Sequence, residues 1–573
     1  MTQEIKAGTV VIGSGCAGLN AVDTLMQLGM DCLLVTEDMD AGTSRNTGSD
    51  KQTYYKLSLA GDEPDSVGEL ARSLAGGDMH GDIALAQAAL SARCFLKLCA
   101  LGVPFPTNAY GEYAGYQTDH DTRRRATSAG PLTSRMMTEA LERSVRARGA
   151  RILDRAIAVR IVTDEGGVAA LDVWLREERR LLRIPCAHII LCTGGPAHVY
   201  ADRVYPESQH GMSSLAFEAG AEGANLHCWQ YGLASTGFRW NVSGSYQQAL
   251  PRYVSVDADG TEREFLADAL GEQEAIRMTF LKGYQWPFDP DRVQGSSRVD
   301  LLTQRETRLG RRVYLDYLRN PRGYDPDLLD PEARTYLQRC DALADLPIGR
   351  LRQMNEPAIL LYRSHGIDLD REMLEIRVCA QHHNGGIAVD SHAQTCVPGL
   401  YAAGEAAGTF GRKRPGGSAL NATQTGAVRA AEHIALHPRA SAAVSPAAAP
   451  LSLPRGDAGE VQRLMTACAG IQPDPQAMRD LLGRGRRLLD AQSPACPEDA
   501  DFTARLLLKD ILVTQREVLS AMLYALETET PPPEGVLITR NGVARRVPAR
   551  PVPDRELWFE RVWKAYREER HLS

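Results

Sequence analysis

The sequence lacks the features that mark disulfide-stabilised, metal-binding or membrane-spanning proteins. Its 573 residues include 12 cysteines, but these are scattered and no CxxC pair occurs. This argues against a disulfide framework, a zinc ribbon or an iron–sulfur cluster held by this chain, and we assign no metal ligand. No apolar stretch approaches the length needed to span a bilayer, and the N-terminal segment "MTQEIKAGTVVIGSGCAGL" has no signal-peptide pattern. We expect a cytoplasmic protein.

No excess of one charge sign is present either. The 65 basic and 72 acidic residues give a formal net charge of -7, so neither nucleic acid nor an anionic membrane is an expected partner. The run Arg123–Arg125 is basic, but no interleaved aromatic residues or second basic run accompany it. With 43% hydrophobic residues, a chain of this length can bury a large core and should form two or three domains.

The first motif is a strand, a glycine turn, a helix and a second strand between residues 9 and 36. "TVVIG" is a short β-branched run, "SGCAGLNAVDTLMQLG" has helical spacing, and "DCLLVTE" is a second apolar strand. Gly13, Gly15 and Gly18 form G-x-G-x-x-G in the turn, and Glu37 follows the second strand. Such a turn brings a pyrophosphate to the N-terminus of a helix while the acid binds a ribose diol, so the unit predicts dinucleotide binding.

Two later apolar runs also end in glycine, "LCTGG" at 191–195 and "VPGLYAAGE" at 397–405. A chain that returns repeatedly to one extended ligand favours FAD over NAD. We predict an α/β fold with a Rossmann-like FAD-binding domain, a second domain inserted into it and a C-terminal helical domain. The expected ranges are 1–228 and 372–436 for the FAD-binding domain, 229–371 for the inserted domain, 437–456 for a linker, and 457–573 for the helical domain.

These motifs resemble those of the flavoproteins that include fumarate reductase and succinate dehydrogenase flavoprotein subunits and L-aspartate oxidase. The resemblance runs in order through "VVIGSGCAGL", "CTGG" followed by "VY", "HNGGIAVD", "VPGLYAAGEAAG" and "RPGGSALN". It implies that the inserted domain is an α+β capping domain and that the substrate lies against the flavin between the FAD-binding and capping domains. It also implies non-covalent FAD, because Arg45 and Asn46 stand where the respiratory members have a histidine that binds FAD covalently.

The resemblance also implies roles for individual residues. In "RPGGSAL", Arg414 matches the arginine that holds the substrate carboxylate, whereas Arg412 and Lys413 have no motif support and are expected to be solvated or to face a phosphate. A planar, always charged guanidinium suits a carboxylate better than a lysine does. The implied cofactor-binding residues are Gly13, Gly15, Gly18, Glu37, Ser44, Gly194, Gly195, Gly404, Glu405, Ser418 and Leu420.

Other substrate positions depart from the family pattern. Gln230-Tyr231-Gly232-Leu233 replaces Gln-Phe-His-Pro, so one substrate histidine is missing. In "QHHNGG", Gln381 takes the place of a second histidine; we favour His382 as the catalytic residue, with His383 as the alternative.

The remaining candidates are charged residues with weaker matches. The capping-domain arginine that delivers a proton is assigned to Arg298, and Arg305 stays open. One of Arg123–Arg125 is a candidate for a phosphate or the substrate anion, and His227 is interpreted as structural.

The sequence therefore predicts a fumarate-reductase-like, FAD-dependent oxidoreductase that transfers hydride between FAD and the C–C bond of a carboxylate-bearing, enoate-type small molecule. The lost histidine favours an acid larger and less symmetric than fumarate. The alternatives are an L-aspartate-oxidase-like amino or hydroxy acid oxidase, and a flavoprotein electron-transfer subunit of a larger reductase. A separate electron donor or acceptor is expected as a partner, and homo-oligomerisation stays open.

Overall fold

The computed structural model describes residues 5–61, 64–118, 121–441, 444–445, 447–528 and 533–569. Its centre is a five-stranded parallel sheet with strand order β19-β10-β1-β2-β6. The strands are β1 (Thr9–Ile12), β2 (Cys32–Val35), β6 (Arg151–Leu153), β10 (His188–Leu191) and β19 (Leu400–Ala402). All of these strands except β6 are buried along their whole length, as expected for a parallel sheet covered on both faces.

The two faces of this sheet pack against different partners, because successive side chains of a strand point to opposite sides. Val11, Leu34 and Ile190 belong to one apolar cluster with helices α1 (Cys16–Gln27), α5 (Thr133–Ala147) and α13 (Ser418–Leu436). Val10 and Leu33 join another cluster with the antiparallel sheet β7 (Ala156–Asp164), β8 (Gly167–Leu175) and β9 (Arg180–Pro185). The predicted α/β core with a parallel sheet is therefore confirmed.

The described residues between 43 and 127 form a layer beside α1 and α13. It comprises α2 (Thr43–Asn46), α3 (Val67–Ala75), α4 (Gly81–Ala100) and the small sheet of β3 (Tyr54–Tyr55), β5 (Asp121–Thr127) and β4 (Tyr116–Thr118). Contrary to the sequence-based expectation, α4 is long and apolar enough to cross a membrane by length and composition. In the fold it packs against α3 and α13, with Phe95 and Leu98 fully buried, as in the core helix of a folded domain.

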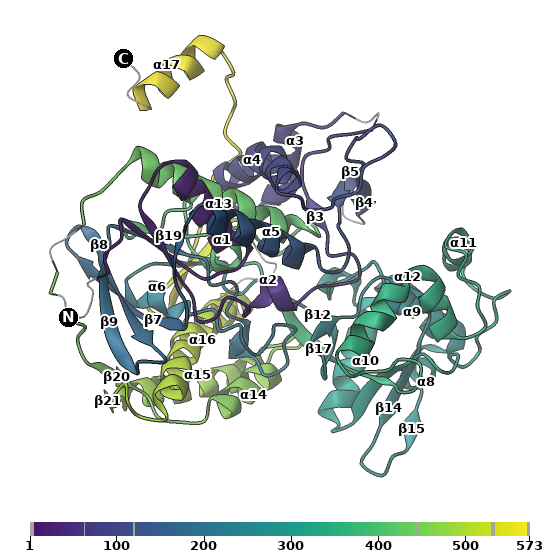
Figure 1. Ribbon diagram of the computed structural model, residues 1–573. Coiled ribbons are helices and arrows are strands. Elements are labelled where there is room, and N and C mark those ends of the chain that lie inside the picture. Colours follow the sequence, from purple (N-terminus) through teal and green to yellow (C-terminus); the bar gives the residue numbers. More distant parts are fainter. Residues whose placement is uncertain are drawn as a thin grey trace.

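A second lobe, residues 229–383, lies to one side of the molecule (Figure 1). Its six-stranded antiparallel sheet has the order β13-β12-β17-β16-β14-β15, with β12 at Trp229–Ser235 and β17 at Leu374–His383. The other strands are β13 (Trp240–Asn241), β14 (Arg252–Val256), β15 (Glu262–Arg263) and β16 (Arg312–Asp316). The sheet continues past the expected limit at 371, because β17 pairs with both β12 and β16.

Six helices accompany that sheet in the second lobe. They are α7 (Ser245–Gln248), α8 (Phe265–Leu270), α9 (Glu272–Lys282), α10 (Ser297–Arg308), α11 (Pro331–Arg339) and α12 (Pro347–Ser364). They share one apolar cluster with the strands, separate from the clusters around the parallel sheet. The lobe therefore has a core of its own.

The C-terminal part has helices in its first portion and at its end, with a β-hairpin between them. Helices α14 (Ala458–Cys468), α15 (Pro475–Asp490) and α16 (Phe502–Thr528) pack together, and α16 also contacts α6 (Ser214–Glu218). Strands β22 (Val536–Arg540) and β23 (Val543–Val547) then form a hairpin that joins β11 (Gly223–Ala224) and β18 (Gly386–Ile387) in one sheet. Helix α17 (Phe559–Glu569) projects from the body (Figure 1). The expectation that the C-terminal part is entirely helical is therefore wrong.

The expected linker at 437–456 is not wholly irregular. Residues 442, 443 and 446 lie outside the described residues, but β20 (Leu451–Leu453) pairs with β21 (Ser493–Ala495). The end of this segment is therefore fixed to the C-terminal helices.

Candidate active site

A cavity of about 840 Å³ runs from the glycine turn after β1 to the second lobe. Its lining comes from the parallel-sheet core, from the loop at 41–53 and from residues 241–286 and 332–336 of the second lobe. A large concave cavity between two lobes is the usual place for a cofactor and its substrate.

The glycine turn is shaped by two close approaches. Gly13 has φ of +106°, and a Cβ there would lie 2.5 Å from the carbonyl oxygen of Cys192. A Cβ on Gly18 would lie 1.8 Å from the carbonyl oxygen of Gly13, so Gly18 allows α1 to pack on the turn. Gly13 and Gly15 line the cavity, whereas Gly18 does not. The N-terminus of α1 therefore faces the cavity, where its N–H groups favour an anion.

Glu37 lines the cavity next to this turn. Its carboxylate lies 2.7 Å from His210 Nδ1 and accepts a hydrogen bond of 3.3 Å from Arg176 Nη1. These two partners orient the acid that was predicted to bind a ribose diol. Neither partner was predicted, because both come from segments distant in the sequence.

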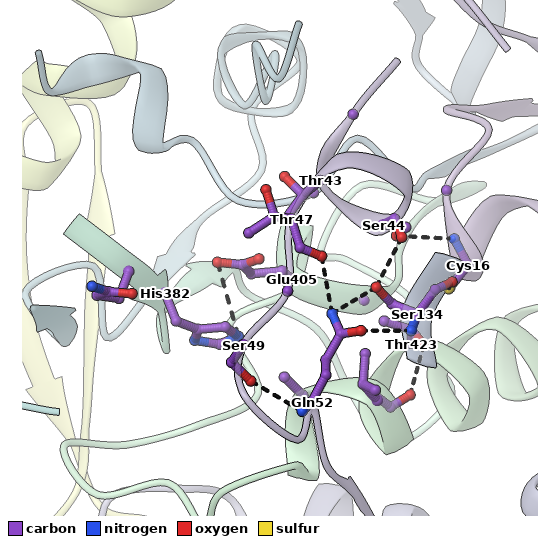
Figure 2. A pocket seen from close by; sticks show the side chains of 18 of the residues that line it. Cys16, Thr43, Ser44, Thr47, Ser49, Gln52, Ser134, His382, Glu405 and Thr423 are labelled. Carbon is purple, nitrogen blue, oxygen red and sulfur yellow. Dashed lines mark hydrogen bonds and ion pairs between the residues drawn. The ribbon is translucent and has the colours of Figure 1, made fainter. Parts of the chain in front are cut away.

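The loop that follows is held to α5 by Gln52. Figure 2 shows Gln52 between Thr47 and Ser134: its amide donates to the Thr47 carbonyl and to Ser134 Oγ, and its oxygen accepts from the Ser134 N–H at 2.8 Å. Ser44 lines the cavity, and its Oγ accepts from the Cys16 N–H at 3.2 Å. The loop thereby closes over the start of α1.

Arg45 and Asn46, at the position of the family's covalent histidine, are both engaged within the protein. Arg45 is buried and pairs with Glu142, and the Asn46 amide donates to the backbone oxygens of Asp40 and Gly42. Neither lines the cavity. This arrangement agrees with FAD that is bound without a covalent link.

Glu405, in the 3-10 turn Gly404–Ala406, is a largely buried carboxyl at the cavity wall. It accepts hydrogen bonds from the Tyr205 hydroxyl and from the His383 N–H, the latter at 2.9 Å. A Cβ on Gly195 would lie 2.4 Å from Glu405 Oε1, so Gly195 makes room for the carboxyl while Gly194 lines the cavity. Burial raises the pKa of Glu405 to about 7.

Arg414 reaches the cavity from the loop before α13. Its Nε and Nη2 both donate to Gln230 Oε1, at 3.1 and 2.7 Å, and its Nη1 donates to the Pro415 carbonyl at 3.2 Å. Ser418 Oγ donates to the same carbonyl at 2.7 Å and does not line the cavity. Ser418 thus fixes the turn, and Leu420 forms part of the wall. Desolvation lowers the pKa of Arg414 to about 10, so the guanidinium stays charged at neutral pH.

The two neighbouring cations point elsewhere. Arg412 forms a two-pronged ion pair with Asp78, with N–O distances of 2.7 and 3.0 Å. Lys413 pairs with Asp291 at 2.6 Å on the surface. Neither lines the cavity, which leaves Arg414 as the cation of this loop that faces it.

His382 and His383 have different environments. His382 lines the cavity; its Nδ1 lies 3.0 Å from Asn384 Oδ1 and its Nε2 lies 3.8 Å from Glu405 Oε1. Because an amide oxygen only accepts, Nδ1 carries the hydrogen and Nε2 has a free lone pair. Burial and the charge of Arg414 hold the pKa of His382 well below its usual value, so the ring is neutral.

His383 is turned into the protein. Its Nε2 lies 3.1 Å from the Leu226 carbonyl, its ring stacks on Trp229 with centroids 4.1 Å apart, and it does not line the cavity. Gln381 does line the cavity and donates to the Gly232 carbonyl at 2.8 Å. Of the three candidates at 381–383, His383 is therefore the one that the fold keeps from the cavity.

Several charged candidates are also not brought to the cavity. Arg298 lies on α10, where its charge helps to lower the pKa of Glu274, and Arg305 is exposed on the same helix. Arg125 is buried in ion pairs with Asp65 and Asp121. The expectations for Arg298 and Arg123–Arg125 thus find no support in the positions of these side chains, which do not line the cavity.

The fit of the cavity to FAD can be judged from its own atoms. Gly13 lines the cavity, and a side chain there would collide with the Cys192 carbonyl, so the turn can be this tight only with glycine. Buried Thr47 Oγ1 and Thr193 Oγ1, both from cavity-lining residues, have no hydrogen-bond partner within the described structure. Buried hydroxyls without a hydrogen-bond partner, beside the N-terminus of a helix, are suited to a polar, anionic ligand. The residues present therefore fit FAD, with Glu37 at one end and Glu405 and Leu420 at the other.

Comparison with known proteins agrees with this fit. A family model described as "FAD binding domain" matches residues 8–420. Proteins named L-aspartate oxidase from Streptomyces coelicolor and Agrobacterium fabrum are 26% and 27% identical over 494 and 508 residues, which is 82% and 85% of this chain and 77% and 86% of theirs. A fumarate reductase (CoM/CoB) subunit from Methanothermobacter marburgensis is 24% identical over 306 residues, 53% of this chain and 49% of its own.

Solved structures show the same fold. The Mycobacterium smegmatis Sdh1 structure with UQ1 has a TM-score of 0.73 at 18% identity and covers 99% of this chain and 98% of its own. A quinol-fumarate reductase with menaquinol has a TM-score of 0.70 at 17% identity and covers 97% of this chain and 100% of its own. The chain belongs to the FAD-binding domain family and is an FAD-dependent oxidoreductase of the fumarate reductase and L-aspartate oxidase group.

Proposed function

We propose that the protein reduces the carbon–carbon double bond of a small carboxylic acid, an enoate, with non-covalently bound FAD. The observation that carries this proposal is Arg414, a charged and largely buried guanidinium on the cavity wall beside Gln230 and His382. A desolvated guanidinium fork is suited to a carboxylate, and fixed donors stabilise charge that develops on it during reaction.

The reduction breaks one C–C π bond and forms two C–H bonds, from one hydride and one proton. FAD, once reduced by a separate electron donor, supplies the hydride chemistry. The chain binds the acid, orients it and provides the proton. Arg414 holds the carboxylate, while Gln230 keeps the guanidinium in plane by accepting from its Nε and Nη2.

We assign the proton to His382. Burial is the main cause that keeps the imidazole neutral, and a bound carboxylate offsets the second cause, the charge of Arg414, so that the pKa of His382 rises when the acid binds. Glu405, with a pKa of about 7, is the neighbouring acid that resupplies the proton. Its Oε1 lies 3.8 Å from His382 Nε2 and accepts from Tyr205 and His383, so the proton sits on the other carboxyl oxygen and reaches His382 through a small side-chain movement. His382 acts as the general acid toward the substrate carbon.

An anaerobic assay with reduced viologen tests the function. The FAD-loaded protein should oxidise the dye when an enoate such as crotonate, fumarate or a larger homologue is added. We expect a larger, less symmetric acid to be the better substrate, because Gly232 stands at the position of the missing histidine. Fumarate turned over as fast as any acid in the panel would contradict this specificity.

A second candidate is an oxidase for an amino or hydroxy acid. It is favoured by the relatives named L-aspartate oxidase, which match more than four-fifths of this chain. The free lone pair on His382 Nε2 could accept a proton from a substrate ammonium group. Peroxide formation in air with L-aspartate or another amino acid, and no viologen oxidation by enoates, would establish this candidate instead.

A third candidate is an electron-transfer subunit of a larger reductase, and a separate electron donor or acceptor is part of all three candidates. Co-purification of a ferredoxin-like partner, with no activity of the chain alone, would favour the third.

We propose a cytoplasmic location, which is supported by twelve free cysteines, since disulfides are rare in reducing compartments.

A further inference from the structure

The end of the cavity in the second lobe is lined by aromatic side chains. Phe280, Tyr284 and Trp286 come from the end of α9 and the loop after it, and Tyr336 comes from α11. Phe280 lies between Tyr284 and Tyr336, with ring centroids 6.2 and 5.5 Å away. Only 6% of the chain is aromatic, so four such residues at one end of a cavity form a concentrated aromatic wall. Glu332 also lines the cavity there and accepts a hydrogen bond from the Tyr284 hydroxyl.

Trp286 and Gly232 are fitted to each other. A Cβ on Gly232 would lie 2.6 Å from Trp286 Nε1, so the indole can occupy this place only if residue 232 has no side chain. The loop carrying the indole is held on β12 by a 2.7 Å hydrogen bond from the Phe288 N–H to the Tyr231 carbonyl. The Trp286 indole thus occupies the space that a side chain at position 232 of β12 would need.

The same strand also carries Gln230, the partner of Arg414. Gln230 and Gly232 are two residues apart on β12, roughly 7 Å in a regular strand, and the pairing with β17 shifts between Gln230 and Tyr231. We infer from this spacing that one small acid reaches from the anion-binding end of the cavity to the indole. A carboxylate on Arg414 and a ring against Trp286 would then be joined by a chain of two or three carbons.

We propose that the substrate is an aryl-substituted enoate, a 3-arylpropenoate, whose carboxylate is held by Arg414 and whose ring lies against Trp286, Tyr284 and Tyr336. The inference rests on the proposed reductase function and names its substrate class. The product is the 3-arylpropanoate: the C=C π bond is replaced by two C–H bonds, with the two electrons coming from reduced FAD and its separate donor. Aromatic walls bind flat rings by offset or edge-to-face contact.

The first test compares cinnamate with crotonate, which carries a methyl group in place of the phenyl ring. The FAD-loaded enzyme should reduce cinnamate with a kcat/KM about tenfold or more above that for crotonate, from the area of the ring that is removed from water. In Trp286→Ala this ratio should fall about tenfold, and in Gly232→Ala it should also fall, because the new methyl displaces the indole. Trp558→Ala, which removes a 61% exposed indole on the C-terminal tail, is the matched control and should keep the ratio.

A binding experiment separates this inference from the function on which it rests. The saturated acids 3-phenylpropanoate and butanoate are titrated against the absorbance of oxidised, FAD-loaded protein. Tighter binding of 3-phenylpropanoate that weakens in Trp286→Ala supports the aryl site, even if no enoate is reduced and the reductase proposal fails. Equal binding of the two acids, or equal kcat/KM for cinnamate and crotonate, overturns the aryl site even if enoates are reduced. Each variant is checked for FAD content and thermal midpoint, so that loss of folding is not counted as loss of the ring contact.

Discussion

Replacement of Arg414 gives the largest predicted loss of substrate binding. A guanidinium has five N–H donors. Among the described residues, its Nε and one hydrogen of Nη2 are taken by Gln230, and its Nη1 donates to the Pro415 carbonyl at 3.2 Å and to Ser418 Oγ at 3.5 Å. One N–H of Nη2 is left for the acid, and the acid can replace the long contact between Nη1 and Ser418. Two charge-assisted hydrogen bonds at about 1.5–3 kcal/mol each correspond to a loss of about a hundredfold or more in affinity.

The assay is a titration of a saturated acid against the flavin absorbance of the FAD-loaded variant. Arg414→Ala should weaken binding by that factor, and Arg414→Lys should recover part of it, because lysine keeps the charge but not the planar fork. Arg412→Ala removes a neighbouring cation that is paired with Asp78 and should bind the acid like the parent protein. If Arg414→Ala also bound the acid like the parent, the assignment of the anion site would be refuted.

Three further predictions concern the histidines, the glycine turn and Glu405. His382→Ala should lower kcat with little change in the thermal midpoint of unfolding. His383→Ala should lower the thermal midpoint, because it loses the stack on Trp229 and the hydrogen bond to the Leu226 carbonyl. Equal effects of the two variants in melting and turnover assays would contradict the assignment. Gly18→Ala puts a Cβ 1.8 Å from the Gly13 carbonyl oxygen and should yield protein with little FAD, measured as the absorbance ratio of flavin to protein. Gly485→Ala is the control: the nearest atom to its new Cβ is 3.7 Å away, so this variant should retain FAD. In FAD-free protein, the raised pKa of Glu405, from 4.5 to about 7, makes the ionised form destabilising, so stability is lost as pH rises through this window. Between pH 5 and pH 8, the free energy of unfolding measured with urea should fall less for Glu405→Gln than for the parent protein. An equal fall in both proteins would disprove the effect of burial on Glu405.

The glycine turn and the parallel sheet could be predicted because their signals are local. The spacing of Gly13, Gly15 and Gly18 follows from how closely α1 approaches the turn, and all three precede or begin one helix. The apolar runs at 9–12, 32–35 and 188–191 are continuous because both faces of the sheet are covered.

The choice between His382 and His383 could not be made from the sequence. It depends on how β17 pairs with β12, and that pairing contains an irregularity opposite Gln230 and Tyr231. Gln381 and His382 consequently both line the cavity, although adjacent residues of a regular strand face opposite sides. Register between strands about 150 residues apart is set by tertiary packing, and no local pattern reveals it.

The aromatic wall and the C-terminal hairpin were missed for the same reason. Trp286 and Tyr336 are fifty residues apart in the sequence and come to line one cavity only in the folded second lobe. The hairpin of β22 and β23 finds its partner in a two-residue strand at Gly223–Ala224, which is too short to be detected from the sequence. Charged positions such as Arg298 were assigned from motif spacing alone, which does not determine whether their helix lies at the cavity; no residue of α10 lines it.

The reaction itself is tested most directly by anaerobic mixing of pre-reduced, FAD-loaded protein with one acid at a time while flavin absorbance is recorded. We predict that enoates reoxidise the flavin and are recovered as saturated acids, that cinnamate does so faster than fumarate, and that Arg414→Ala is slow with both. Flavin that stays reduced with every enoate, while L-aspartate reduces the oxidised protein, would contradict the proposed reaction.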